Sequence, residues 1–157
     1  MKLPPIEGRP IRVEVRASLG PHAAVTSIPR RLVLLDSSVL ARHGEFERIL
    51  VHELFHFAWV RLSNETRRGW EDVLRAEFRG RVAGELGWSA EWRKAKLPVR
   101  DASQRTPAWR RYVCESFCDT AAWLFSGLPR HDEFTLPENA RKSRRAWWGK
   151  LPSPLHL

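Results

Sequence analysis

Residues 49–60 read ILVHELFHFAWV, and this stretch decides how the chain folds. From Glu45 to about Leu62 the chain contains neither proline nor glycine, and acidic residues occupy the first turn, where they favour a helix N-terminus. Apolar residues fall on nearly all sides of the helix that this pattern predicts. Because a helix that is apolar all round is normally buried, we expect a central helix on which the rest of the chain packs.

This helix contains the pentad His52-Glu53-Leu54-Phe55-His56. Two histidines four residues apart project from the same side of a helix, so their imidazoles can converge on one metal ion, and Glu53 beside them can reach a water bound to that ion. Burying three polar groups without partners would be strongly unfavourable, and a metal removes that difficulty. We therefore expect one zinc ion (Zn2+) per chain rather than two core histidines.

The pentad resembles the HExxH signature of the zincin metallopeptidases. The metzincin subgroup extends this signature with a glycine and a histidine at positions where this chain has Trp59 and Leu62. That subgroup is therefore excluded, and the third zinc ligand has to lie elsewhere in the chain.

A second helix is predicted from Thr106-Pro107, a side-chain cap followed by proline, to the stop at Gly127. Within 112–125 its only charged residues are Glu115 and Asp119. Two acids four residues apart on a buried face repel each other, so a cation is expected nearby. The pair resembles the gluzincin pattern, which implies Glu115 as the third zinc ligand and Asp119 as the acid that orients a ligand histidine through its other ring nitrogen.

Other roles stay open for these residues. Glu115 could instead pair with Arg111, one helical turn earlier, or Asp119 could be the ligand with Glu115 behind it. His131 is a further candidate ligand in a Pro-Arg-His-Asp loop. Tyr112, one turn before Glu115, is a candidate catalytic donor to the oxyanion, and its alternative is a packed aromatic ring with a satisfied hydroxyl.

The resemblance implies a zinc metalloendopeptidase of gluzincin type that acts on peptide or protein substrates. A zinc-activated water would attack the peptide bond, with Glu53 as general base. An extended substrate would add to the edge of the sheet, expected at Arg31–Asp36. Two alternatives are a SprT-like protease associated with nucleic acid, which would need a third histidine ligand and a zinc ribbon that are not visible, and a catalytically silent zinc-binding module with the zincin fold.

Two strands are predicted before the central helix. Ile11, Val13 and Val15 alternate with charged residues, which indicates a strand with one buried face, and the apolar run Arg31–Asp36 indicates a more buried strand. The expected fold class is α+β and zincin-like, with a small N-terminal β-sheet packed on the buried HExxH helix and on a second ligand-bearing helix.

The remaining segments predict smaller elements. A surface helix is expected over Glu65–Arg79, and Trp88 and Trp92 suggest a short helical piece that packs down on the domain. Val99–Arg105 is typical of a loop. A short basic helix is expected from Pro137 to about Gly149, with its two tryptophans docked on the domain and its charged face in solvent.

Composition narrows the class of protein. The chain has 157 residues, which suits one domain over 1–157 with a basic, tryptophan-containing C-terminal segment at about 137–157. The net charge of +9 makes nucleic acid a conceivable partner, but no recognisable motif favours it. Cys114 and Cys118 are expected to be small core residues. No apolar run reaches the ~20 residues of a membrane span and no secretory signal is visible, so a cytoplasmic protein is expected.

Overall fold

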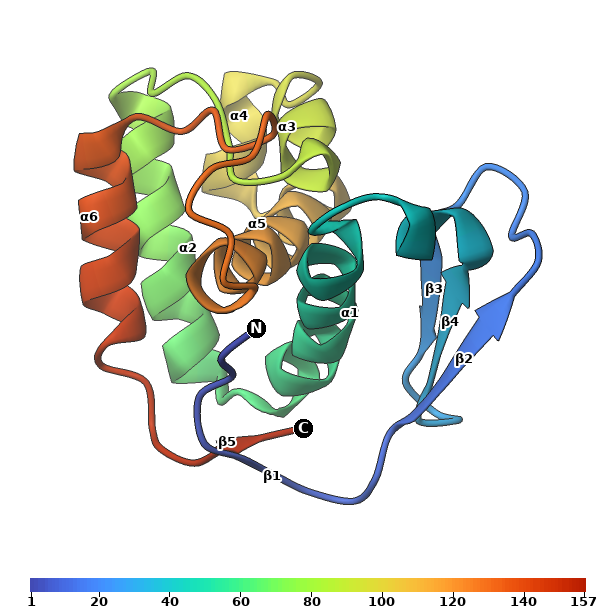
Figure 1. Cartoon of the computed structure of the whole chain (residues 1–157). Helices are drawn as coiled ribbons and strands as arrows, with labels where there is room; N and C mark the ends of the chain where they lie inside the picture. The colour runs from blue at the N-terminus through green and yellow to red at the C-terminus, as the bar shows by residue number, and fades with distance from the viewer.

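The computed structural model describes all 157 residues and has an α+β fold, with a small sheet beside a group of helices (Figure 1). In chain order the elements are β1 (Ile6–Glu7), β2 (Arg12–Arg16), β3 (Ala24–Ser27), β4 (Leu32–Asp36), the 3-10 helix η1 (Ser37–Ala41), α1 (Glu45–Arg61), α2 (Asn64–Arg79), α3 (Trp88–Lys94), α4 (Val99–Gln104), α5 (Pro107–Phe125), α6 (Glu138–Trp148) and β5 (Leu155–His156). None of the helices combines the length and the apolar character needed to span a bilayer.

Helix α1 stands between the sheet and the other helices, with α5 packed along it (Figure 1). Val51 and Phe55 of α1 share one core with Val33 and Leu35 of β4 and with Phe117 of α5. The expected buried central helix is therefore confirmed. Its apolar residues face two layers at once, which explains why they surround the helix axis.

The main sheet has the order β2-β4-β3. Strand β2 runs parallel to β4, with Arg12 opposite Leu32, whereas β3 runs antiparallel to β4, with Ala24 opposite Leu35. The strand predicted at Arg31–Asp36 is thus confirmed, but its expected place at the sheet edge is wrong. It lies in the centre, and β2 and β3 form the two edges, of which β3 is the one beside α1.

The predicted buried face of β2 is also wrong. Val13 and Val15 are 42% and 46% exposed, although their partners Val33 and Leu35 in β4 are completely buried. Helix α1 covers β3 and β4, so β2 extends the sheet beyond the helix that would bury it.

Local capping explains where the other long helices begin. Ser63 caps α2 by accepting a hydrogen bond from the Thr66 amide, and Thr106 caps α5 by accepting one from the Trp109 amide. The predicted surface helix and the predicted start of the second ligand helix are both confirmed. Val99–Arg105, expected as a loop, instead contains the short helix α4, whose buried Ala102 packs into the core.

Two expectations about side chains near the surface fail. Trp88 and Trp92 do lie on a short helix, α3, but they are 62% and 45% exposed and do not pack down. Helix α6 does dock its tryptophans, and Trp148 stacks on Phe117 at 4.6 Å between ring centroids. The charged face of α6 is not entirely solvated, however, because Arg144 is completely buried.

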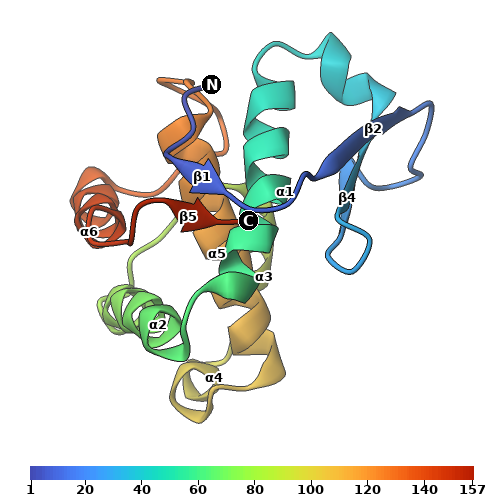
Figure 2. The same ribbon diagram turned by 90° about the horizontal axis from the view of Figure 1, so that it is seen from below.

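The first and last strands of the chain pair with each other. β1 and β5 form a two-stranded parallel sheet in which Ile6 pairs with Leu155 and Glu7 with His156. This pair lies beside α1 and brings the two ends of the chain close together (Figure 2).

Candidate metal centre

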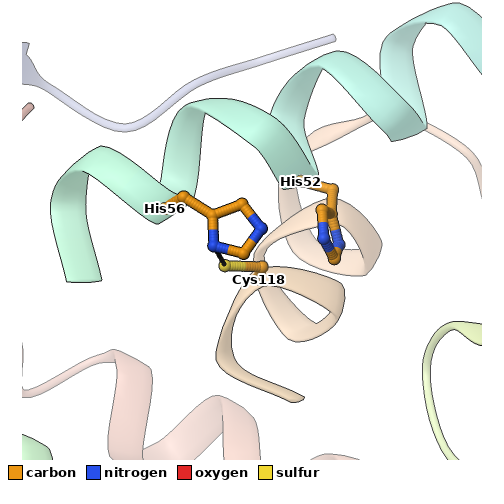
Figure 3. A group of neighbouring side chains, drawn as sticks. All are labelled: His52, His56 and Cys118. Atoms are coloured by element: carbon orange, nitrogen blue, oxygen red, sulfur yellow. Dashed lines mark hydrogen bonds between the residues drawn. The ribbon is translucent and has the colours of Figure 1, made fainter. Parts of the chain in front are cut away.

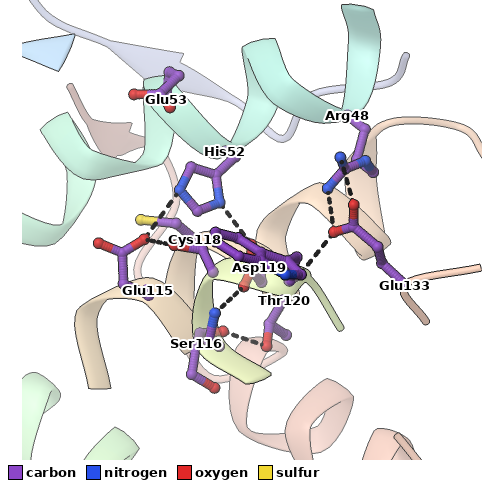
Figure 4. Close-up of polar contacts among 12 residues, drawn as sticks. Arg48, His52, Glu53, Glu115, Ser116, Cys118, Asp119, Thr120 and Glu133 are labelled. Carbon is purple, nitrogen blue, oxygen red and sulfur yellow. Dashed lines mark hydrogen bonds and ion pairs between the residues drawn. The ribbon is translucent and has the colours of Figure 1, made fainter. Parts of the chain in front are cut away.

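The candidate centre lies where α1 and α5 pack side by side. His52 and His56 project from α1 toward α5 (Figure 3), and Glu115 and Asp119 project from α5 toward His52 of α1 (Figure 4). The i, i+4 spacing in each helix puts both members of a pair on one face. His52 is thereby in contact with two acids that lie 63 and 67 positions later in the chain.

His52 sits between two carboxylates and has one for each ring nitrogen. Nδ1 lies 2.7 Å from Asp119 Oδ1, and Nε2 lies 3.3 Å from Glu115 Oε2. Burial acts to lower the pKa of His52, but the charge and hydrogen bond of Asp119 outweigh it and hold the pKa well above its usual value. The two acids therefore favour a cation at this position.

Glu115 is held by three partners, and Arg111 is not among them. Besides His52, the Ser89 hydroxyl donates to Oε2 at 2.6 Å and Arg93 Nη2 lies 3.4 Å from Oε1. Burial acts to raise the pKa of Glu115, but the hydrogen bond from His52 and the nearby imidazoles lower it to about 2. Its carboxylate is thus ionised and directed at His52 Nε2.

The two carboxylate oxygens of Asp119 contact two different helices, α1 and α3. Oδ1 contacts His52 Nδ1, and Oδ2 accepts a hydrogen bond of 3.0 Å from the Ala90 amide near the start of α3. The side chain is only 2% exposed. This close approach requires Gly87, because a Cβ atom there would lie 2.2–2.6 Å from the Asp119 carboxylate. Neither Ala90 nor Gly87 carries a signal in the sequence that would have identified it.

His56 contacts sulfur rather than a carboxylate. Its Nδ1 lies 3.4 Å from Cys118 Sγ (Figure 3). The Cys114 Sγ atom lies 3.6 Å from the same nitrogen. A hydrogen bond from Cys118 lowers the pKa of Cys114 to about 6, against the effect of burial and with help from His56. Both cysteines are free, and Cys118 is fully buried. They were expected only to fill the core, and their contact with a candidate ligand is a feature that the sequence reasoning missed.

Cys118 offers a second set of donors. One donor atom each from His52, His56 and Cys118 lie within 4.8 Å of one another. In this set the sulfur would replace the Glu115 carboxylate. The spacing of Cys118, three residues after Glu115 and close to the same helical face, is the only sequence signal for it.

Glu53 lies on the sheet side of α1. The Thr26 hydroxyl of β3 donates a 2.6 Å hydrogen bond to Glu53 Oε2, which fixes one carboxylate oxygen. Thr26 was not predicted as a site residue, because the short strand that carries it was not recognised. Glu53 and both histidines line the β3–α3 groove, which we define by Val25 and Thr26 of β3 on one side, His52, Glu53, His56 and Val60 of α1 at its base, and Trp88, Trp92 and Glu115 on the other side.

Tyr112 and His131 are not brought to this centre. Tyr112 is fully buried, and its hydroxyl donates to Glu85 Oε1 at 2.5 Å. Burial and the Glu85 charge raise the pKa of Tyr112 well above its usual value. The structure thus places the candidate oxyanion donor in a separate polar cluster, in agreement with the packed-aromatic alternative. His131 Nε2 contacts Glu45 Oε1 at 2.9 Å, at the start of α1.

The spacing of His52 and Glu115 suits two zinc ligands, whereas the third candidate, His56, converges with His52 and Cys118. Two ligands at about 2.1 Å from a tetrahedral zinc ion are about 3.4 Å apart, and His52 Nε2 and Glu115 Oε2 are separated by 3.3 Å. Asp119 on Nδ1 leaves the Nε2 lone pair for a metal, as the partner of a ligand imidazole normally does. Imidazole and carboxylate together are a usual zinc donor set.

No protein-family model, curated protein or solved structure matches this chain, so its function has to be inferred from its own residues.

Proposed function

We propose that the chain is a zinc-dependent peptide hydrolase of gluzincin type. The observation that carries the proposal is the arrangement around His52, where Nε2 faces the Glu115 carboxylate and Nδ1 is held by Asp119. His52, His56 and Glu115 would hold the zinc ion. The small sheet beside α1 and the second helix α5 support a zincin-like arrangement of the α+β fold.

Each side chain has a defined task in this proposal. When bound, zinc supplies Lewis acidity that polarises a carbonyl and makes a water more acidic. Glu53 accepts the proton from the attacking water and passes it to the leaving amine. Thr26 holds Glu53 Oε2, which directs the other oxygen of the carboxylate to this proton transfer.

The buried residues behind the ligands set their protonation. Asp119 keeps the proton of His52 on Nδ1, so that Nε2 can donate its lone pair. Ser89 and Arg93 fix the direction of the Glu115 carboxylate, and the Ser89 hydrogen bond also helps the two imidazoles to lower its pKa. Three protein ligands would leave one position open to solvent, which is typical of a catalytic zinc site rather than a structural one.

The proposal is tested with protein purified without a histidine tag. We expect about one zinc per chain by mass spectrometry of the metal, cleavage of a peptide library, loss of cleavage with a chelator and its return with zinc. Glu53→Gln should keep the metal and lower kcat by about 10²- to 10⁴-fold. Glu65→Gln, an exposed acid on α2, is the matched control and should change neither quantity. Metal-free protein, or a Glu53→Gln variant as active as the parent, would overturn the proposal.

A structural zinc site is the second candidate, favoured by the Cys118 sulfur at 3.4 Å from His56. Cobalt substitution separates the two ligand sets, since only a cysteine thiolate gives a strong sulfur-to-metal charge-transfer band. We expect no such band, and retention of the metal by Cys118→Ser. A band that disappears in Cys118→Ser would favour the structural site, whereas loss of metal in Glu115→Gln would favour the catalytic one.

A further inference from the structure

The exposed apolar side chains of this protein are unevenly distributed. Of eight tryptophans only Trp88 and Trp92 are exposed, at 62% and 45%, and both line the β3–α3 groove. Val25 and Val60, which are 41% and 44% exposed, line the same groove. Four of the ten exposed large apolar residues thus surround the candidate metal centre. A cluster of exposed apolar residues at a functional groove usually marks a binding surface.

The two indoles form one aromatic surface. Trp88 and Trp92 are one helical turn apart, and their rings are stacked at 6.0 Å between centroids with an interplanar angle of 26°. Lys96 Nζ lies 3.5 Å from the Trp92 ring centroid, so that ring is also fixed by a cation–π contact. Trp88 and Glu53 both line the β3–α3 groove and also a second, neighbouring cavity. The Trp88 ring is therefore the part of this surface that a ligand can cover.

The backbone beneath the indoles is rigidly held. The Trp88 amide donates to Glu133 Oε2 at 2.7 Å, and the Ala90 amide donates to Asp119 Oδ2 at 3.0 Å. Ser89, between them, donates to Glu115. The aromatic surface is thus anchored directly to two acids of the candidate metal centre, and its distance from that centre is fixed.

The opposite wall of the groove is a free sheet edge. β3 pairs with β4 on one side only, so the outward backbone amides and carbonyls of Ala24–Ser27 can pair with an extended peptide. The charge at the middle of the groove is partly balanced internally, because Arg93 faces Glu115. The exposed indoles and valines that line the groove favour a peptide with a large apolar side chain.

We propose that Trp88 and Trp92 form the specificity wall of the groove, and that they select an extended peptide carrying a large apolar or aromatic side chain next to the bond that is cleaved. The apolar side chain packs on the indoles while the peptide backbone pairs with β3. The proposal rests on the proposed hydrolase function for its substrate and adds the residues that determine selectivity.

The test uses matched peptides that differ only in alanine, leucine or phenylalanine beside the cleaved bond. We expect the full-length zinc-loaded protein to prefer phenylalanine over alanine by at least about tenfold in kcat/KM. In the Trp88→Ala/Trp92→Ala protein this ratio should fall close to one. The change should come from a lower kcat/KM for the phenylalanine peptide, mainly because its KM rises. Trp88→Phe should keep most of the preference, and Val99→Ala, an 82% exposed apolar residue on α4, serves as the control.

A second measurement does not depend on turnover. In the Glu53→Gln background, calorimetry with the phenylalanine peptide should show a Kd at least about tenfold weaker when both tryptophans are replaced. Suppose that the parent protein cleaves peptides. If the double variant keeps the phenylalanine preference, or loses activity on all three peptides equally, the proposed specificity wall is overturned while the hydrolase proposal stands. If the parent cleaves nothing, the hydrolase is overturned, and the calorimetry alone decides whether the indoles bind an apolar peptide.

Discussion

Helix α5 carries two buried polar clusters on two of its faces, and they differ in how fully their charges are balanced. One face presents Tyr112, Ser116 and Thr120 to the guanidinium cluster, which we define as Arg144 with Glu77, Glu85 and Lys94. The other face presents Glu115 and Asp119 to His52.

The guanidinium cluster is complete. Arg144 has no exposed surface and makes two hydrogen bonds to each of Glu77 and Glu85, at 2.7–3.0 Å. With Lys94 at 3.2 Å from Glu85, two cations balance two carboxylates. Such a cluster has nothing left to bind, and its role is to join α2, α5 and α6.

The cluster at His52 is not complete. Glu53, Glu115 and Asp119 are three acids, and Arg93 at 3.4 Å from Glu115 is the only arginine or lysine that forms an ion pair with any of them. His52, whose pKa is raised, can supply a further positive charge by taking up a proton, and a metal ion can take the place of that proton. Of the two clusters, this one has room for a bound cation, because it lacks a second permanent positive charge and opens to a groove.

The largest expected effect concerns the complete cluster. Arg144→Met leaves two buried carboxylates without their main cation, which should reduce the free energy of unfolding by about 3–5 kcal/mol in urea denaturation. Lys142→Ala, an exposed residue on the same helix, should change it by less than about 0.5 kcal/mol. A loss below about 1 kcal/mol for Arg144→Met would show that the cluster does not hold α6 in place.

The next effect concerns the incomplete cluster. Asp119→Asn cannot orient His52 Nδ1 and accept from the Ala90 amide equally well, so zinc affinity should fall by about 10- to 100-fold in a chelator competition. Ser116→Ala, one turn away on the other face, should leave zinc affinity unchanged. Equal losses in the two variants would mean that Asp119 acts only through stability.

A smaller effect is expected at Gly87. Its φ of −178° suits any residue, so Gly87→Ala tests only the contact with Asp119, which lies 2.2–2.6 Å from the new methyl group. Unfolding free energy should fall by about 1–3 kcal/mol, together with zinc affinity. Gly149→Ala, where the nearest atom is 3.7 Å away, is the matched control. A Gly87→Ala protein with parental zinc affinity would show that the position of α3 does not affect zinc binding.

The smallest expected effect is on the pH dependence of the free energy of unfolding. Burial acts to raise the pKa of Glu85, but Arg144 outweighs it and holds the pKa below its usual value of 4.5. A carboxyl with a lowered pKa in the folded state stabilises the protein above pH 4.5, and this contribution is lost as the pH falls through the folded-state pKa. The free energy of unfolding should therefore fall less steeply below pH 4.5 in Glu85→Gln than in the parent. Parallel pH profiles would contradict the pairing with Arg144.

The elements determined by local chemistry could be predicted from the sequence. Helix α1 is visible as a long apolar run without helix breakers, and the start of α5 as a Thr-Pro cap. The contact of Asp119 with His52 agrees with the role that the gluzincin resemblance implied. The short strands β1, β3 and β5 were not predicted, because a run of two to four residues is too short to show a strand pattern and forms a strand only beside a partner strand.

The unpredicted side-chain roles depend on tertiary contacts in the same way. Arg144 appears in the sequence as one member of a basic run, and only the carboxylates of Glu77 and Glu85, 67 and 59 residues away, make it a buried residue. Trp88 and Trp92 are the opposite case, because they are apolar residues that the fold leaves exposed. Their spacing predicts an apolar helix face, but nothing in the sequence shows that this face borders a groove rather than the core.

The attachment of α3 to the centre has a consequence for how such a protein could diverge. Asp119 and Glu133 hold this helix through the amides of Ala90 and Trp88, and not through the indole rings. Main-chain anchors are retained whatever side chains occupy positions 88 and 92. The wall of the groove can therefore be exchanged residue by residue, in evolution or by design, without disturbing the ligands beside it, whereas Gly87 and Asp119 allow almost no change.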